Sequence, residues 1–502
     1  MSNSIPESGF SVEQEALSGR LPVLATERVY GTYGSFLWTC CAFSAATWAF
    51  LMGGFLPFVG DWRIGVMGYV IGLIIGMATV GLASGAASHR YGTDVIDAAK
   101  SSFGYRGIVV PLFGLLATLI GWSFVVEALT ARGAANIVAT ISKSGLTGNG
   151  HEKLVVCFAL VALLLVWLIA SKGPKMFERL NGYVGPLHML ITAMMLGILV
   201  YRFGWHTLWT SQVPVDHMLT RDPTRGLALA VELGMSNSLT WWPVIGGLTR
   251  LVKNRSHIVG PSIIGVGLLG AALVSTVAAL ASISAGTNDP TVWMITLAGP
   301  LVGSLTMGVV LIANVSTMVV MVYLAGVSIQ QIKIFSRIRW ELLLAVMLLP
   351  GIYLAFKTEW LLTASMSFLS YNGVMFVGVT GVTLVDYFAM RRGHLDLAHL
   401  FATRESKYEF WGGVNWVAVA VTFVAAAIYL WLYNPVTSAM AEPFKYLGAS
   451  IPVVVISGAL YYVGMRLITV PLGKGSYSDR RGSVSVATLE DNPASGAVTV
   501  SL

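Results

Sequence analysis

The sequence predicts an all-α polytopic membrane protein with twelve transmembrane helices, and three observations lead to this fold class. First, 55% of the 502 residues are hydrophobic and only 11% are charged, whereas a soluble protein carries about 25% charged residues. Second, apolar segments of the roughly 20 residues that a bilayer requires run almost from end to end, which predicts one membrane domain. Third, the basic residues gather in alternate loops between these segments. Because the basic residues lie in these short loops, the net charge of +7 does not indicate a nucleic-acid partner, and none is expected.

The expected spans are separated by short polar loops, and their ends are defined to within a few residues. They cover residues 34–60, 64–88, 107–139, 154–171, 180–202, 226–249, 257–285, 301–327, 340–357, 363–389, 411–434 and 446–468. The segment from Pro290 to Ala298 is too short to cross a bilayer and is expected to form a short helix in an outer loop.

The distribution of Lys and Arg predicts the orientation of these spans. Most of the 31 basic side chains fall in the loops that share a side with the N-terminus, and cytoplasmic loops are the ones enriched in Lys and Arg. We therefore expect both termini in the cytoplasm, with cytoplasmic tails at residues 1–33 and 471–502. The second tail is rich in Ser, Gly and charge and is expected to be disordered, with no function assigned.

The first span is apolar, but its middle consists of small and hydroxyl residues between Thr39 and Thr47. Hydroxyl groups can satisfy backbone groups where a helix opens, and a broken first helix that turns its carbonyls toward a cation is a recurrent feature of secondary transporters. Small residues also allow two intact helices to pack closely. Both readings of this span remain open on the sequence alone.

The third span places Trp122 near mid-bilayer and Glu127 five residues further on. Tryptophan prefers the membrane interface, so a central tryptophan indicates either stacking on a flat ring or a packing role. A carboxylate inside a span is costly and suggests function, although a structural pair between Glu127 and Arg132 would also explain it.

The sixth span contains Gly, Asn, Ser, Thr and Pro close together and makes a poor continuous helix, so a break near Asn237 is expected. Glu232 is a second carboxylate inside a span. Counted along the helices, Glu127 and Glu232 lie at a similar depth on the outer side of Trp122 and Ser238. The hypothesis is an acidic outer vestibule that attracts a cation or a cationic substrate.

The eighth span carries Ala313, Ser316 and Thr317 at positions i, i+3 and i+4, on one helix face. Two hydroxyl groups beside a freed carbonyl are oxygen ligands that suit a monovalent cation. The alternative is that both hydroxyls bond back to their own helix.

Several function classes receive no support from the sequence. It contains no Walker loop, no dinucleotide fingerprint and no cysteine–histidine metal pattern, so coupling to ATP and a bound cofactor are not expected. A membrane-embedded enzyme would need a cluster of catalytic groups within the spans, and only scattered ones are found. A channel would usually lack paired half-helices around a closed central site.

Five stretches resemble the nucleobase:cation symporter family, which includes cytosine, hydantoin, allantoin and hydroxymethylpyrimidine permeases of bacteria. They occur in the family's order and at fitting spans, and the resemblance covers roughly residues 30–470. The stretches are AFSAATWAFLMGG (42–54), GTDVIDAAKSSFGYRG (92–107), IGWSFVV (120–126), VDYFAMRRG (385–393) and GGVNWVAV (412–419).

The resemblance implies a LeuT-like fold of five plus five helices as inverted repeats, with discontinuous helices 1 and 6. The repeats would form a transport core over residues 34–389, followed by helices 11 and 12 within 390–470. It also implies alternating access in the bacterial cytoplasmic membrane, and we expect a monomer.

The resemblance further implies two binding sites. The sodium site would use backbone carbonyls near Thr39 and Ala42 and at Ala313, together with the hydroxyls of Ser316 and Thr317. The substrate would stack on Trp122, beside Phe43 and Ser44 of the first helix break and Asn237 and Ser238 of the sixth.

The sequence departs from the family pattern at the substrate site. Ser238 stands where the family usually has an aromatic clamp, and Trp241 or Trp242 would have to replace it from one helical turn away. The family's ring-binding amides on the third and eighth helices are not evident here, and the apolar residues Val126 and Val322 stand near their expected positions. Glu127 and Glu232 are also atypical, so a standard pyrimidine is not favoured.

We therefore predict a secondary active transporter, not an enzyme, that imports a small planar nitrogenous compound such as a nucleobase, a hydantoin or an allantoin-like molecule together with sodium. One cation that enters through about 100 mV supplies about 2.3 kcal/mol, enough for roughly fifty-fold accumulation. The alternative is a proton-coupled importer of a small cationic amine or guanidino compound that uses Glu127 and Glu232.

Overall fold

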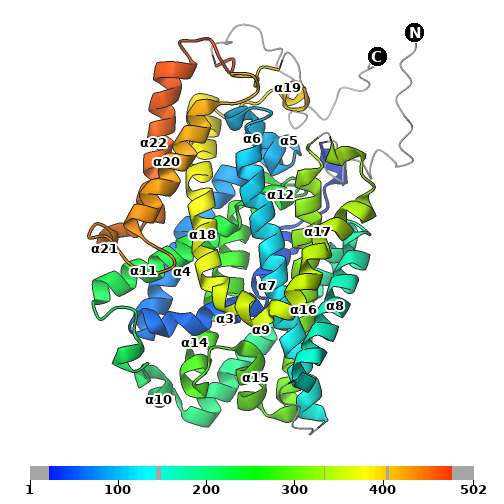
Figure 1. The fold of residues 1–502 in the computed structure, drawn as a ribbon, viewed down its shortest axis with the longest axis vertical. Coiled ribbons are helices and arrows are strands. Elements are labelled where there is room, and N and C mark those ends of the chain that lie inside the picture. The colour runs from blue at the N-terminus through cyan, green and yellow to red at the C-terminus, as the bar shows by residue number, and fades with distance from the viewer. Residues whose placement is uncertain (1–21, 143–148, 333, 403–405, 478–502) are drawn as a thin grey trace.

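The computed structural model describes residues 22–142, 149–332, 334–402 and 406–477, and these residues form a bundle of helices whose longest members run along the long axis of the molecule (Figure 1). Eight helices are long and apolar enough to cross a membrane, or nine if the bent first pair is one span. The protein is thus an all-helical polytopic membrane protein, while the count of twelve spans stays a prediction. The predicted tails lie outside the described residues at 1–21 and 478–502.

The helices follow in this order along the chain. In the first half they are α2 (Tyr33–Ser44), α3 (Thr47–Phe55), α4 (Trp62–Val80), α5 (Ala86–Tyr91), α6 (Val95–Phe103), α7 (Val109–Ile141), α8 (Asn149–Ala170), α9 (Pro174–Phe203), α10 (Trp205–Thr210), α11 (Pro223–Thr240) and α12 (Trp242–Thr249). In the second half they are α13 (Val259–Pro261), α14 (Val274–Ala285), α15 (Pro290–Ala298), α16 (Pro300–Ile329), α17 (Trp340–Leu354), α18 (Thr358–Val385), α19 (Leu397–Phe401), α20 (Trp416–Leu432), α21 (Phe444–Leu447) and α22 (Ser450–Gly464). Four π-helical segments extend or join them: η3 (Gly81–Gly85), η6 (Ser262–Leu273), η9 (Asp386–Met390) and η10 (Met465–Thr469).

Four of the twelve expected spans do not appear as separate crossing helices. The ninth and tenth, α17 and α18, run on through a short 3-10 turn as one apolar stretch of 51 residues, and the eleventh, α20, is apolar but has only 17 residues. The α11–α12 pair is not among the candidate spans of the described chain. Figure 1 shows α20 and α22 at one flank of the bundle, beside α18, with α8 at the other flank.

The first span is broken between α2 and α3, which are bent by 60° relative to each other. Ala45 leaves the helix with φ −81° and ψ 21°, and Ala46 is extended with φ −75° and ψ 174°. The opening falls within the small residues of this span, where no bulky side chain opposes it. The packing of an intact helix, the other reading of this stretch, is not what the structure contains.

The sixth span is interrupted by one residue. The helix α11 ends at Thr240, Trp241 has φ −85° and ψ −2°, and α12 begins at Trp242. The interruption therefore lies four residues after Asn237, which is still inside α11. Pro243 explains the position, because a proline in the first turn of α12 supplies no N–H to the turn before it.

Among the described helices, α4 and α11 have the most extensive contact, and glycines allow their backbones to approach. A Cβ atom at Gly72 would lie 2.2 Å from the backbone oxygen of Val231, and one at Gly234 would lie 2.3 Å from that of Tyr69. Small residues are the usual means by which membrane helices bring their backbones together. This contact fixes α11 of the sixth span against the second span.

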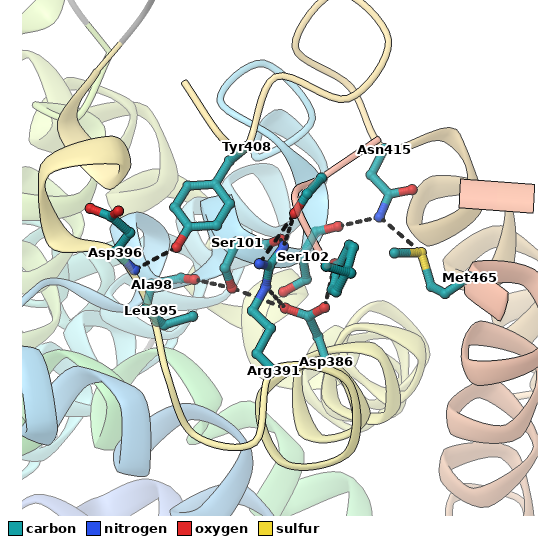
Figure 2. A network of polar contacts seen from close by, with 12 residues as sticks. Ala98, Ser101, Ser102, Asp386, Arg391, Leu395, Asp396, Tyr408, Asn415 and Met465 are labelled. Carbon is teal, nitrogen blue, oxygen red and sulfur yellow. Dashed lines mark hydrogen bonds and ion pairs between the residues drawn. The ribbon is translucent and has the colours of Figure 1, made fainter. Parts of the chain in front are cut away.

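A polar network joins several segments at the end of the bundle that carries the described termini (Figure 2). Arg391, just after η9, donates to the carboxylate of Asp386 at 2.9 Å, to the carbonyl of Ser101 in α6 at 2.7 Å and to that of Gly475 at 3.4 Å. Its guanidinium also lies over the rings of Tyr408 and Tyr477, at 4.7 and 4.1 Å. Residues 471–477 are thus held against the bundle, which departs from the disorder expected for the tail from 471 onward.

The beginning of the described chain is held at the same end. Val23 donates its N–H to Gly92 at 2.9 Å, and Arg28 donates to the carbonyl of His89 at 2.7 Å. Tyr30 pairs with the chain after α12 through its N–H to Leu251, at 2.9 Å. The described chain therefore begins and ends at the same end of the bundle.

Candidate functional site

The end of α2 faces α16 across the break of the first span. Ala42 and Ala313 are both fully buried and form a small cluster with Val184 of α9. The hydroxyl of Thr317 lies 3.4 Å from the carbonyl oxygen of Phe43 and 3.0 Å from that of Ala313. A side-chain hydroxyl and a backbone carbonyl that the break has released from helical pairing thus lie side by side.

The remaining residues of the predicted cation site lie close to this contact. Ser316 is 1% exposed and precedes Thr317 on α16, while Thr39 lies one turn before Phe43 on α2. The hydroxyl of Thr39 donates to the carbonyl of Ser35 at 2.9 Å, a bond within its own helix. The sequence also allowed the hydroxyl of Thr317 to bond back to its own helix, and the bond to the carbonyl of Ala313 does this. The structure contains both this bond and the contact with Phe43 across the break.

Asn314 also belongs to this region, and sequence reasoning missed it. Its carboxamide oxygen accepts from the backbone N–H of Thr47 at 2.9 Å and from the Thr47 hydroxyl at 2.8 Å. The residue that precedes α3, Ala46, has no side chain that could cap the helix. An asparagine inside an apolar span, next to Ala313, was the signal that could have identified it.

Three tryptophans surround a pocket beside the two breaks. They are Trp48 from α3, Trp122 from α7 and Trp241 from the α11–α12 junction. The Trp48 ring centroid lies 6.0 Å from that of Trp122 and 6.1 Å from that of Trp241, with interplanar angles of 58° and 49°. Thr118, Leu119, Asn237, Thr240, Val244 and Met321 complete the lining. The sequence predicted Trp122, Asn237 and Trp241, but not Trp48.

Most polar groups of this pocket are already paired. Asn237 donates its amide to the hydroxyl of Tyr69 at 2.7 Å, Thr240 donates to the carbonyl of Asn237 at 2.6 Å, and Thr118 donates to Asn372. Within the described chain, the buried indole N–H of Trp122 has no hydrogen-bond partner. The pocket therefore offers an unpaired donor between aromatic walls.

Three residues predicted for the substrate site do not line this pocket. Ser238 packs against α4, and its hydroxyl donates to Gly234 at 2.9 Å. Ser44 donates its hydroxyl to the carbonyl of Val266 in η6 at 2.9 Å. Phe43 contributes its backbone carbonyl to the break and not its ring to the lining. Ser238 thus takes part in helix packing, which also explains why no bulky ring stands there.

Glu232 corrects the expectation of an acidic vestibule. It is 1% exposed, and its carboxylate accepts from the hydroxyl of Tyr429 at 2.8 Å and from the backbone N–H groups of Ala449 and Ser450 at 2.7 Å each. The hydroxyls of Ser236 and Ser450 add two more bonds, at 3.0 and 2.6 Å. A carboxylate on the first N–H groups of a helix is a favourable cap, so Glu232 fastens the start of α22 to α11.

Glu127 is also buried, but in a different place. It is 1% exposed, and its carboxyl group lies beside Gly351 of α17, next to which Leu163 of α8 also packs. Neither carboxyl oxygen has a hydrogen-bond partner among the residues described. Arg132 does not pair with it, since Arg132 binds Asp289 at 2.8 Å and also Glu359. The two carboxylates neither meet nor line an open vestibule.

A broken span beside hydroxyl groups of another helix, next to an aromatic pocket, defines the class of protein as a secondary transporter. The chain belongs to the nucleobase:cation symporter family: the family model described as "permease for cytosine/purines, uracil, thiamine, allantoin" matches residues 22–456.

Two curated relatives match short segments of the chain. An allantoin permease of Bacillus subtilis (strain 168) is 33% identical over 106 residues, which is 21% of this chain and 20% of the relative. A hydantoin permease of Microbacterium maritypicum is 44% identical over 50 residues, which is 10% of either protein. The matches thus span a fifth or less of these relatives.

Two solved structures share the fold at low sequence identity. The structure of Mhp1, a nucleobase-cation-symport-1 family transporter in a closed conformation with bromovinylhydantoin bound, is 17% identical, with a TM-score of 0.70 over 89% of this chain and 95% of its own. A Na⁺-coupled sialic acid symporter is 13% identical, with a TM-score of 0.61 over 92% of this chain and 93% of its own. The likeness establishes a LeuT-type helical fold.

Proposed function

We propose that this protein is a sodium-coupled symporter that imports a small, planar, uncharged nitrogenous compound by alternating access. One observation carries the proposal: the break of the first span turns the Phe43 carbonyl toward Thr317 and, five residues later, places Trp48 in the wall of the pocket. A cation and a ring compound would therefore share one mobile element.

The cation would be held between α2 and α16. Carbonyl oxygens near Thr39, at Ala42 and at Ala313 would bind it together with the hydroxyls of Ser316 and Thr317. The arrangement of Thr317 supports this set, because its hydroxyl already faces a carbonyl of α2 at 3.4 Å. Because coupling is reciprocal, sodium should tighten substrate binding and substrate should tighten sodium binding by the same factor.

The pocket favours an uncharged ring. Among the nine residues that line it there is no charged side chain, and three are tryptophans. The unpaired indole N–H of Trp122 suits a ring compound that carries a carbonyl group. Hydantoins and allantoin carry such groups, and the names of the two curated relatives agree with this choice.

The topology belongs to the same proposal. The inverted repeats would occupy residues 34–389, α20 and α22 would be the two helices added after them, and the shared end of the described chain would face the cytoplasm of a bacterium. The protein would act as a monomer. The position of the described termini at one end supports an even number of spans.

A ligand screen tests the proposal. Thermal unfolding of the purified protein is measured with nucleobases, hydantoins, allantoin, hydroxymethylpyrimidine and small amines, each in sodium chloride or choline chloride. We expect a ring compound to raise the unfolding temperature more in sodium than in choline. Stabilisation that is equal in both salts for every compound would contradict sodium coupling.

The Ser316→Ala and Thr317→Ala double variant tests the cation site directly. Loss of two oxygen ligands should abolish the difference in substrate affinity between sodium chloride and choline chloride. The substrate affinity measured in choline chloride should stay within about threefold of the wild-type value. A hydrogen bond or ligand to a charged group contributes roughly 1.5–3 kcal/mol, so the sodium affinity itself should fall by tenfold or more. A sodium effect that persists would remove these residues from the site.

A second candidate function is coupling to protons through Glu127. Its two carboxyl oxygens have no partner in the described part of the chain, and a carboxyl in such a place is by default a candidate proton carrier. Glu232 no longer supports this alternative, because helix α22 uses it as a cap. The expected test result is that Glu127→Gln abolishes any pH dependence of uptake but preserves exchange of substrate across the membrane. Unchanged pH dependence would exclude Glu127 as the proton site.

A further inference from the structure

The helix α16 contacts both halves of the broken first span, at positions three residues apart. Thr317 faces the end of α2 through the carbonyl of Phe43. One turn earlier, Asn314 accepts two hydrogen bonds from Thr47, the first residue of α3, at 2.9 and 2.8 Å. Asn314 and Thr47 are both fully buried. The helix α16 thus contacts the chain on both sides of the break between α2 and α3.

The start of α3 depends on this contact. A helix begins with N–H groups that have no partner of their own, and inside a membrane no bulk water is present to satisfy them. Ala46, the residue in the capping position, is extended and carries only a methyl group. The carboxamide of Asn314 therefore takes the place of the cap, and α3 must follow α16 to keep it.

The next residue of α3 is a wall of the substrate pocket. Trp48 lines the pocket with its ring, and its indole N–H lies 3.4 Å from the carbonyl of Phe43. The same carbonyl faces Thr317. The Phe43 carbonyl thus links the spacing of α2 and α16 to the position of Trp48 through two polar contacts of 3.4 Å.

We propose that Asn314 is a positioning residue that transmits cation binding to the substrate pocket. The inference rests on the proposed sodium site between α2 and α16. An ion there draws the two helices together, and Asn314, one residue after Ala313, moves Thr47 and the Trp48 wall with α16. Asn314 is not itself a ligand of the ion, because its carboxamide oxygen is occupied by Thr47.

Hydrogen exchange with sodium as the only added ligand tests this role. The full-length purified protein is exposed to deuterium oxide in sodium chloride or in choline chloride, and exchange is followed in peptides that cover residues 37–44 and 46–52. In the wild type we expect sodium to slow exchange in both segments. In Asn314→Ala, sodium should still protect 37–44, but its protection of 46–52 should fall by about fivefold or more, as loss of a buried hydrogen bond predicts.

Ser275→Ala is the matched control. Ser275 of α14 donates its hydroxyl to the carbonyl of Ala49 at 3.0 Å. This variant therefore removes one buried hydrogen bond that holds α3, where Asn314→Ala removes two, and it does so from a helix outside the cation site. We expect sodium to protect both segments in Ser275→Ala as in the wild type. Equal loss of protection in Ser275→Ala and Asn314→Ala would mean general loosening of α3 and would overturn the proposal.

Two further variants keep the test decisive if Asn314→Ala does not fold. Thr47→Val removes the hydroxyl bond and keeps the backbone bond, so protection of 46–52 should fall by an intermediate factor. Thr47→Ser keeps the hydroxyl group and should behave as the wild type. Full protection of 46–52 in Asn314→Ala or Thr47→Val would overturn the proposed role of Asn314 and would leave the proposed sodium site unaffected. A wild type in which sodium protects neither segment overturns the proposed sodium site and this inference together.

Discussion

At the scale of single residues, the pocket is defined by side chains that reach it from separate elements. Trp48, Trp122 and Trp241 are each 4% exposed and enclose it with rings tilted to one another. A tilted set of rings surrounds a guest on several sides, whereas a parallel pair would clamp only its two faces. The specificity of the site should therefore depend on the size and hydrogen-bond pattern of the ring compound, and not on its charge.

Removal of one wall should weaken substrate binding. Stacking of a base on an aromatic ring is worth roughly 1–3 kcal/mol, so Trp122→Ala should raise the dissociation constant by about five-fold to over a hundred-fold. Trp122→Phe keeps a ring in the wall and should recover most of the affinity. Binding is measured by calorimetry with the best compound of the ligand screen. Unchanged affinity in Trp122→Ala would place the substrate elsewhere.

At the scale of helices, the breaks and the close contacts have different physical origins. The first span opens where its residues are smallest and its cap is supplied by another helix. The second and sixth spans approach through glycines, so that Gly72 and Gly234 lie against backbone atoms. Ser238 packs against α4 in the same interface, beside Gly76. This interface, rather than substrate binding, accounts for the loss of the expected aromatic residue.

A methyl group in this interface should be poorly tolerated. A Cβ at Gly72 would meet a backbone oxygen at 2.2 Å, which no side-chain movement can relieve. Overpacking typically costs 1–3 kcal/mol, so Gly72→Ala should lower the unfolding temperature and reduce transport. Gly308→Ala on α16, where no atom lies within 4 Å of the added Cβ, is the control and should be neutral. Equal thermal stability of the two variants would contradict the close contact of α4 and α11.

At the scale of the whole molecule, polar contacts tie distant parts of the chain together at one end of the bundle. The network around Arg391 joins α6, the end of α18 and the segment up to Tyr477 (Figure 2). The hydroxyls of Tyr461 and Tyr477 both donate to Asp386, at 2.9 and 2.6 Å. The planar guanidinium of Arg391 lies over two rings and donates to three acceptors at once, and the ammonium group of a lysine cannot make this set of contacts.

The network predicts different effects for two neighbouring arginines. Arg391→Lys loses the planar contacts and most of the hydrogen bonds, so it should cost about 1–3 kcal/mol of stability and expose the chain near Gly475 to proteases. Arg392→Lys, at the next position, is the control and should leave both properties unchanged. The measurements are thermal unfolding and limited proteolysis followed by mass spectrometry. Slow proteolysis near Gly475 in both variants would show that the network does not hold the segment that ends at Tyr477.

The features set by local sequence were predictable. Hydropathy and charge alone identify a polytopic membrane protein, because they decide whether a segment partitions into lipid. The α15 helix has the bounds expected from its short apolar run, Pro290–Ala298, and the opening of the first span falls among its small residues. The motifs placed the chain in its family, as the match over residues 22–456 confirms.

The features that only the tertiary structure decided are partnerships between helices. Trp48 joins the pocket, Asn314 caps α3 and Glu232 caps α22 because of how the helices pack. Asn314 binds Thr47, 267 residues away in the sequence, and Glu232 binds Tyr429, 197 residues away. A sequence shows that a polar residue within a span needs a partner, since an unpaired polar group in lipid is costly. Which partner it finds depends on the three-dimensional arrangement, and that arrangement separates a helix cap such as Glu232 from an unpaired carboxyl such as Glu127.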